Sequence, residues 1–114
     1  MSVADQIWIN IKFDHLKDDL EAIVNSNTIL YKYKLLLKMK DGERITTITR
    51  LIIGLSDLSS QDRNLNQIIK PIKELFEEAE VIRNNNIYED LKDPTDTIKK
   101  IIGLIEKEKK SIFR

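Results

Sequence analysis

Apolar and basic residues alternate along the stretch from Leu30 to Lys40. The apolar residues at every second position are Tyr31, Tyr33, Leu35, Leu37 and Met39. Successive side chains of an extended strand point to opposite faces, so a period of two residues predicts a β-strand. Asp41-Gly42 follows directly, and this dipeptide beside an alternating stretch is a strong hairpin signal. The pattern therefore predicts a hairpin over residues 30–53.

Two registers of this hairpin are compatible with the turn. A two-residue loop pairs Lys40 with Glu43, whereas a three-residue loop over 40–42 pairs Met39 with Glu43. The longer loop suits Gly42, because its last residue takes a left-handed backbone conformation that glycine adopts without steric cost. It also separates apolar from basic side chains better, and register decides which face each side chain occupies. In that register the basic face carries Lys32, Lys34, Lys38, Arg44 and Arg50.

A helical alternative exists for the second half of the hairpin, because its apolar residues also recur every three or four positions. These residues are Ile45, Ile48, Ile52 and Leu55. Three threonines between positions 46 and 49 count against a helix, since β-branched side chains lose rotamer freedom there. The strand is the preferred interpretation, and a helix over residues 43–58 remains open.

The N-terminal residues 6–13 show the same alternation and predict another strand, with Trp8 on its polar side. The apolar side of this strand consists of Ile7, Ile9, Ile11 and Phe13. Asp14 is a favourable N-cap, because its carboxylate can accept a hydrogen bond from a first-turn amide. We therefore expect a helix from Asp14 to the polar run at 25–27.

A longer helix is predicted over residues 65–82, where the apolar residues form a stripe with helical spacing. Pro71 lies inside this stripe and predicts a kink, or a break near Lys70, because proline removes one backbone hydrogen bond. The asparagines at 84–86 are expected to end the helix, since asparagine tolerates a left-handed backbone.

The stretch from Asp93 to Asp96 predicts the start of the last helix. It places an N-cap, a proline at the first helical position and an acidic residue in the first turn. The apolar side of this helix offers Ile98, Ile101, Ile102 and Ile105.

Together these elements predict an α+β fold. We expect a three-stranded antiparallel sheet in strand-helix-strand-strand-helix order, with helices on one face and an extra C-terminal helix. The length fits one domain over 1–114, with an α+β core over 1–86 and a C-terminal helical extension over 87–114. The alternative is an all-α bundle, with helices in place of the hairpin strands.

The charge of the chain is balanced overall but uneven along the sequence. The 114 residues include 19 basic and 19 acidic ones, so no net charge attracts nucleic acid or an acidic membrane. Residues 28–56, however, carry six basic residues against two acidic ones. The chain has no cysteine, which excludes disulfides and thiol chemistry and indicates a reducing, cytoplasmic setting. No apolar run reaches the roughly 20 residues of a membrane span, and the first residues lack signal-peptide features.

Residues that could carry catalysis are few and isolated. His15 is the single histidine and lies in the first turn of a predicted helix. Asp18-Asp19 and Glu77-Glu78 are adjacent carboxylates, but neighbours on a helix point about 100° apart. The glycines are isolated and form no phosphate-binding loop. We therefore expect no catalytic, cofactor or metal site and no enzyme activity, and no motif identifies a family.

Two classes of function fit this chain. We prefer a non-catalytic binding or assembly module that forms a dimer or binds a protein partner. Its candidate interface residues are Trp8, Ile98, Ile101 and Ile105. The alternative is nucleic-acid binding by the basic hairpin face, because regularly spaced cations can meet phosphates. Tyr31 and Tyr33 lie on the opposite face in the chosen register, so the aromatic platform for base stacking is missing. The sequence indicates neither a membrane partner nor a small-molecule ligand.

Overall fold

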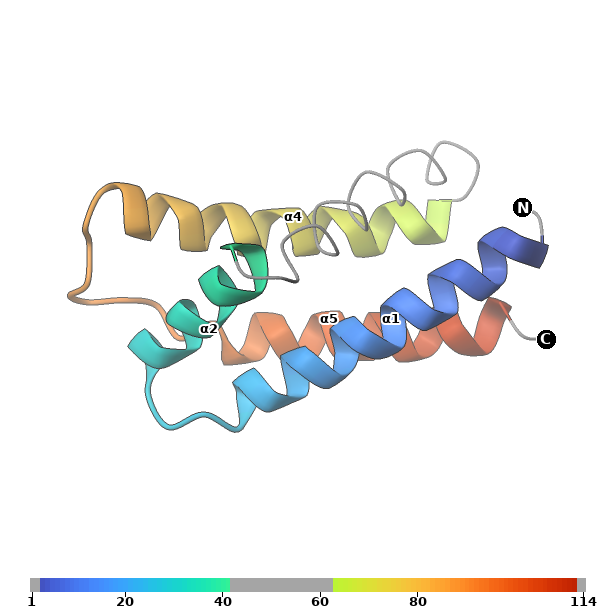
Figure 1. Cartoon of the computed structure of the whole chain (residues 1–114), viewed down its shortest axis with the longest axis horizontal. Coiled ribbons are helices and arrows are strands. Elements are labelled where there is room, and N and C mark those ends of the chain that lie inside the picture. Colours follow the sequence, from blue (N-terminus) through green and yellow to red (C-terminus); the bar gives the residue numbers. More distant parts are fainter. Residues whose placement is uncertain (1–2, 42–62, 113–114) are drawn as a thin grey trace.

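The computed structural model of the chain describes residues 3–41 and 63–112. In these two ranges the chain forms four α-helices and no β-strand (Figure 1). The helices are α1 (Val3–Val24), α2 (Ile29–Asp41), α4 (Arg63–Asn84) and α5 (Thr95–Ile112). The described part of the protein is therefore all-helical, and the prediction of an α+β fold with a three-stranded sheet is wrong.

The predicted first strand and the helix after it are one continuous helix, α1. Residues 6–13 lie in its first half, and Asp14 lies in its interior rather than at an N-cap. The buried residues of α1 recur every three or four positions through both halves: Ile9, Phe13, Leu16, Leu20 and Ile23. This spacing is the core-facing stripe of a helix. The alternation over residues 6–13 suggested a strand because the outward side of this helix is apolar as well as the side that faces the core.

The first half of the predicted hairpin forms α2. Its buried apolar residues are Tyr33, Leu36 and Met39, which are three positions apart and therefore share one side of a helix. In the predicted hairpin register, Leu36 would share the basic face with Lys34 and Lys38, because alternate residues of a strand lie on one face; Leu36 is instead fully buried. The three consecutive leucines at 35–37 fit both the strand period of two and the helical period of three to four residues. The alternation of lysines with the other apolar residues therefore suggested a strand that does not form. The second half of the hairpin, residues 43–53, lies outside the described residues, as do Arg44 and Arg50.

The helix around Pro71 is confirmed. It continues through Lys70 and Pro71, so the predicted break near Lys70 does not occur, and the alternative of a kink stays a prediction. Proline lacks the amide that would bond to the carbonyl four residues earlier, which belongs to Gln67. Because Gln67 is exposed, water can bind that carbonyl in place of the missing amide. The missing hydrogen bond is therefore tolerated at this position.

The predicted end of this helix is confirmed at the asparagines. Asn86 has a φ of 54°, a left-handed conformation. The Asn86 amide donates to the Arg83 carbonyl at 3.2 Å and the Ile87 amide donates to the Ile82 carbonyl at 3.1 Å. These two bonds make the Schellman motif, which satisfies carbonyls that the helix end would leave without partners.

The starts of α2 and α5 are also set by side-chain caps. Thr28 Oγ1 accepts a hydrogen bond from the Tyr31 amide at 3.1 Å, so Thr28 caps α2. At α5 the predicted cap is confirmed, because Asp93 Oδ1 accepts a hydrogen bond from the Thr95 amide at 2.9 Å. Pro94 follows the cap, and its carbonyl accepts a bond from the Ile98 amide at 2.9 Å.

The four helices pack as a ring of neighbours in which α5 lies between α1 and α4, and α2 contacts both α1 and α4 (Figure 1). The ends of the described chain, at the start of α1 and the end of α5, lie at the same end of the molecule. Ile98, Ile101 and Ile105 of α5 are fully buried in the same core as the residues of α1 and α4. The division into a core over 1–86 and an extension over 87–114 stays a prediction, although α5 supplies three residues to the shared core.

Candidate functional site

The outward side of α1 carries a row of exposed aliphatic residues. Val3, Ile7 and Ile11 lie four positions apart, and their exposed fractions are 71 %, 51 % and 46 %. Residues at this spacing lie one above another on a helix. We call Val3, Ile7 and Ile11 the outer α1 stripe. Ile7 and Ile11 lie about 160° around the helix from the core residue Ile9, and Val3 lies about 120° from it. The first half of α1 is therefore apolar on two sides.

Beyond Ile11 the same outward side becomes acidic. Asp14, Asp18 and Glu21 continue the row at intervals of three or four residues, and Asp18 and Glu21 are exposed. The outward side of α1 is therefore divided into an aliphatic N-terminal half and an acidic C-terminal half.

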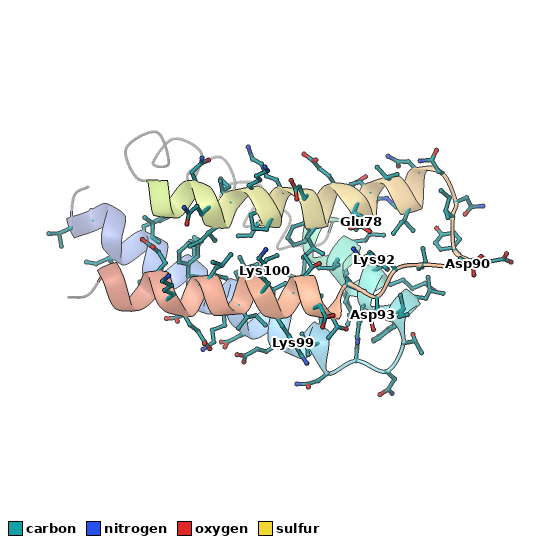
Figure 2. The ribbon with its side chains drawn as sticks, turned by 180° about the vertical axis from the view of Figure 1, so that it is seen from behind. Glu78, Asp90, Lys92, Asp93, Lys99 and Lys100 are labelled. Atoms are coloured by element: carbon teal, nitrogen blue, oxygen red, sulfur yellow. The ribbon has the colours of Figure 1, made fainter. Side chains whose placement is uncertain are left out.

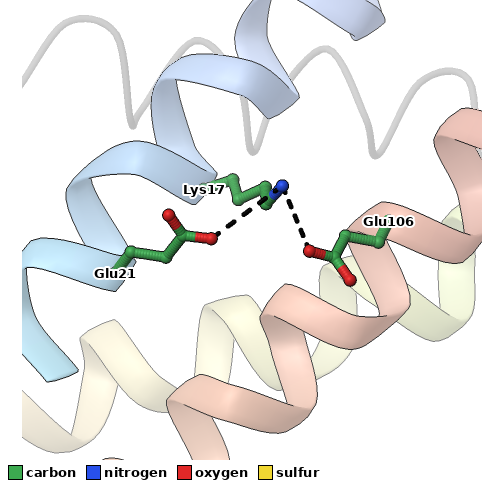
Figure 3. A network of polar contacts seen from close by, with 3 residues as sticks. All are labelled: Lys17, Glu21 and Glu106. Atoms are coloured by element: carbon green, nitrogen blue, oxygen red, sulfur yellow. Dashed lines mark ion pairs between the residues drawn. The ribbon is translucent and has the colours of Figure 1, made fainter.

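The acidic half of α1 is linked to α5 through Lys17 (Figure 3). Lys17 Nζ lies 3.1 Å from Glu106 Oε1 of α5 and 3.9 Å from Glu21 Oε1. The hydrogen bond to Glu106 and the Glu106 charge raise the pKa of Lys17. This ion pair is exposed to solvent, so its main effect is to orient side chains between two helices that the core already holds together.

A second polar group joins α2 to the start of α5. Lys32 Nζ donates to Thr95 Oγ1 at 2.8 Å, and the Thr95 hydroxyl donates to Asp93 Oδ1. Tyr33 belongs to the same group, because its hydroxyl donates to the Lys92 carbonyl at 2.7 Å. We call Lys32, Tyr33, Asp93 and Thr95 the α2–α5 polar cluster.

The electrostatics of the α2–α5 polar cluster follow from its hydrogen bonds. The two bonds from Thr95, first the hydroxyl and then the amide, lower the pKa of Asp93. Burial, followed by the charge of Glu78, raises the pKa of Tyr33, so the hydroxyl stays protonated as a donor. Figure 2 shows Glu78, Lys92 and Asp93 at the end of the bundle where the chain from α4 reaches α5. The cluster therefore connects α2 to the start of α5, and each of its polar atoms named here has a partner within it or on the main chain.

The predicted basic surface is not assembled by α2. Lys32 is buried and bonded to Thr95, whereas Lys34 and Lys38 are exposed on a different side of the helix. Arg44 and Arg50 lie outside the described residues. On α2, Lys34 and Lys38 share one side and Lys32 lies on the other, so the hairpin face on which nucleic-acid binding was predicted does not exist in the described part of the chain.

The predicted interface residues lie mainly in the core. Ile98, Ile101 and Ile105 are fully buried between helices, and Trp8 is half-buried and packed against the core. An interface through the three isoleucines would require the core to open. Trp8 remains near the surface, on the first half of α1 beside the outer α1 stripe.

The other polar residues considered in the sequence do not form a site. His15 and Asp18 are exposed three positions apart on α1, whereas Glu77 is exposed on α4. The described side chains include no group of three or more histidine or acidic residues that could hold a metal ion. Among the helices of residues 3–41 and 63–112, none has the length and apolar character needed to cross a membrane.

The chain has no significant match among protein-family models, curated proteins or solved structures.

Interpretation of the sequence missed the outer α1 stripe. The four apolar residues at 7, 9, 11 and 13 read as one face of a strand, whereas Ile7 and Ile11 face outward and Ile9 and Phe13 face the core. The spacing of four from Val3 through Ile7 to Ile11 is the signal that could have identified it. The sequence alone does not say which of the two apolar sides of α1 the rest of the chain covers.

Proposed function

We propose that the protein is a non-catalytic assembly module that binds a second copy of itself through the outer α1 stripe. The observation that carries this proposal is the alignment of Val3, Ile7 and Ile11, all exposed to solvent, on one side of one helix. Single exposed aliphatic residues are common on soluble proteins. A contiguous row of three is different, because its removal from water is favourable and such patches mark interaction sites.

A non-catalytic role accords with the way the polar side chains are used. Lys32, Thr95 and Asp93 bond to one another across two elements, and the Tyr33 hydroxyl bonds to a main-chain carbonyl. Their hydrogen bonds link α2 to the start of α5. These contacts support a structural role for the cluster and favour a function performed by the surface.

The size of the stripe sets the expected strength of the association. A standard interface buries roughly 800 Å² per partner, and three side chains with their neighbours supply less than that. We therefore expect a dimer that dissociates on the order of micromolar concentrations. Symmetric pairing is the simplest geometry, since one surface then serves both copies.

The test is the effect of one charge on the molar mass in solution. Ile7→Lys places a charge in the middle of the outer α1 stripe, and Val81→Lys is the matched control because Val81 is equally exposed on α4. Size-exclusion chromatography with light scattering should give a dimer for the unmodified protein and for Val81→Lys, and a monomer for Ile7→Lys. A monomer for the unmodified protein at high micromolar concentration, or equal loss in both variants, would contradict the proposal.

A second candidate function, nucleic-acid binding, is favoured by one observation on α2. Tyr31 is exposed and lies on the same side of the helix as Lys34 and Lys38, which are also exposed. An aromatic ring beside two cations can stack on a base while the lysines meet phosphates. The test is a salt titration with single-stranded nucleic acid. Binding that falls with salt and is lost in Tyr31→Ala and in Lys34→Glu with Lys38→Glu supports it, and no binding at low salt rejects it.

A further inference from the structure

We infer that the two copies meet with their α1 helices antiparallel, across a two-fold axis that passes beside Ile7. This inference rests on the proposed self-association and adds the orientation of the partner, which is a second copy of this chain. It follows from two features of the outward side of α1: where the aliphatic row is centred, and where the acidic row begins.

The first feature is the position of Ile7 in the middle of the outer α1 stripe. With a rise of about 1.5 Å per residue, Val3 and Ile11 lie about 6 Å from Ile7 in opposite directions along the helix. An axis beside Ile7 sets each Ile7 against the partner's Ile7. It also sets Val3 against the partner's Ile11, so all six aliphatic side chains are covered at once.

The second feature is the change from aliphatic to acidic residues after Ile11. In a parallel pair, Asp14, Asp18 and Glu21 would each face the same residue of the other copy, and like charges at close range repel. In the antiparallel pair these residues pass beyond the aliphatic contact. Charge therefore selects the antiparallel arrangement.

The antiparallel arrangement also places a charge favourably. Asp14 lies three residues, about 4.5 Å, beyond Ile11, which places it just past the partner's Val3, at the N-terminal end of the partner's α1. The main-chain amides at the start of a helix carry a partial positive charge that favours a nearby anion. In the antiparallel pair, the outer α1 stripe of one copy thus packs against that of the other, and Asp14 of each copy lies near the N-terminal end of the partner's α1.

Disulfide cross-linking tests the orientation, because the chain contains no cysteine and each introduced thiol is unique. A disulfide requires the two Cα atoms to lie within about 7 Å. Under oxidation, full-length Ile7→Cys should form a covalent dimer, and a mixture of Val3→Cys with Ile11→Cys should form the mixed dimer. Ile11→Cys alone should cross-link at least about tenfold more slowly than Ile7→Cys, because its two copies are offset by about 12 Å along the helices. Val81→Cys reports the background rate of random collision.

The outcomes separate the orientation from the association itself. If Ile11→Cys cross-links to itself as fast as Ile7→Cys, the helices are parallel and the inferred axis is wrong, although the dimer stands. If none of the α1 variants exceeds the Val81→Cys rate while the reduced proteins sediment as dimers, the interface lies elsewhere and both proposals about α1 fail. If the reduced proteins sediment as monomers, the self-association itself is refuted.

Discussion

Replacing Tyr33 by phenylalanine removes one hydroxyl from the junction of α2, α4 and α5 and leaves the ring in place. Tyr33 is 1 % exposed, and its hydroxyl lies 2.7 Å from the Lys92 carbonyl and 3.3 Å from Glu78 Oε1. The hydroxyl has one proton to donate, and the shorter distance assigns it to the carbonyl. Burial raises the pKa of Tyr33, so this donor persists at alkaline pH.

The expected cost of Tyr33→Phe follows from this single bond. Phenylalanine keeps the buried ring and its apolar contacts, so the change in free energy of unfolding comes from the lost hydrogen bond. Such a bond contributes about 1 kcal/mol, and water can reach the carbonyl of the exposed Lys92, which limits the penalty. A loss of about 1 kcal/mol lowers the melting temperature of a domain of this size by about 4 °C.

Tyr31→Phe is the matched control, because Tyr31 lies on the same helix and is 52 % exposed. Its free energy of unfolding should stay within about 0.5 kcal/mol of the unmodified protein. Urea titrations followed by circular dichroism measure both variants. In a strand, Tyr31 and Tyr33 would share a face and respond alike, whereas on α2 they lie about 200° apart. Equal effects of the two substitutions would refute the placement of Tyr33 described here.

Two further predictions concern the core of α1 and the cap of α5. Phe13→Ala should lower the free energy of unfolding by about 3–5 kcal/mol in urea titrations, because the ring is fully buried. Ile11→Ala should lower it far less in the monomer, because Ile11 is exposed. Similar losses in the two variants would contradict the assignment of the two sides of α1. For the cap, the folded pKa of Asp93 lies below its ordinary value of 3.8, so its stabilising effect is complete above pH 3.8 and is lost as pH falls through the folded pKa. Stability measured against pH in Asp93→Asn should lack this part of the acid-induced loss, and an unchanged pH profile would show that the carboxylate is not held by Thr95.

The elements that could be predicted from sequence are those with one apolar side. The helix around Pro71 and the last helix have an apolar stripe on one side and polar residues on the other, so the helical period is unambiguous. Their ends were predictable for local reasons, because Asn86 adopts a left-handed backbone and Asp93 caps the following helix.

The first two helices could not be recognised because their polar residues do not mark a single side. In α1, Ile7 faces solvent and Ile9 faces the core, so apolar residues at every second position mimic a strand. In α2, Lys32 is buried beside Thr95, a residue 63 positions away in sequence. No local pattern reveals that a lysine is buried in this way, since its partner comes from tertiary packing.

The candidate surface was predictable only in part. The spacing of Val3, Ile7 and Ile11 is visible in the sequence, but a helix with two apolar sides leaves open which side the protein buries. The structure resolves this for α1, because Phe13 and the other buried residues lie against α5 and its neighbours. Ile98, Ile101 and Ile105 were predicted as an interface because they are apolar and share one side of the last helix. The structure buries all three side chains in the core.

Sedimentation equilibrium of the unmodified chain tests most directly whether the outer α1 stripe joins two copies. As the concentration rises from about 1 µM to about 500 µM, the apparent mass should increase from the 13.3 kDa of one chain toward twice that value, with the midpoint in the micromolar range. The same experiment with Ile7→Lys should give 13.3 kDa throughout. A constant mass of 13.3 kDa for the unmodified chain over the whole range would contradict self-association and remove the case for α1 as an interface.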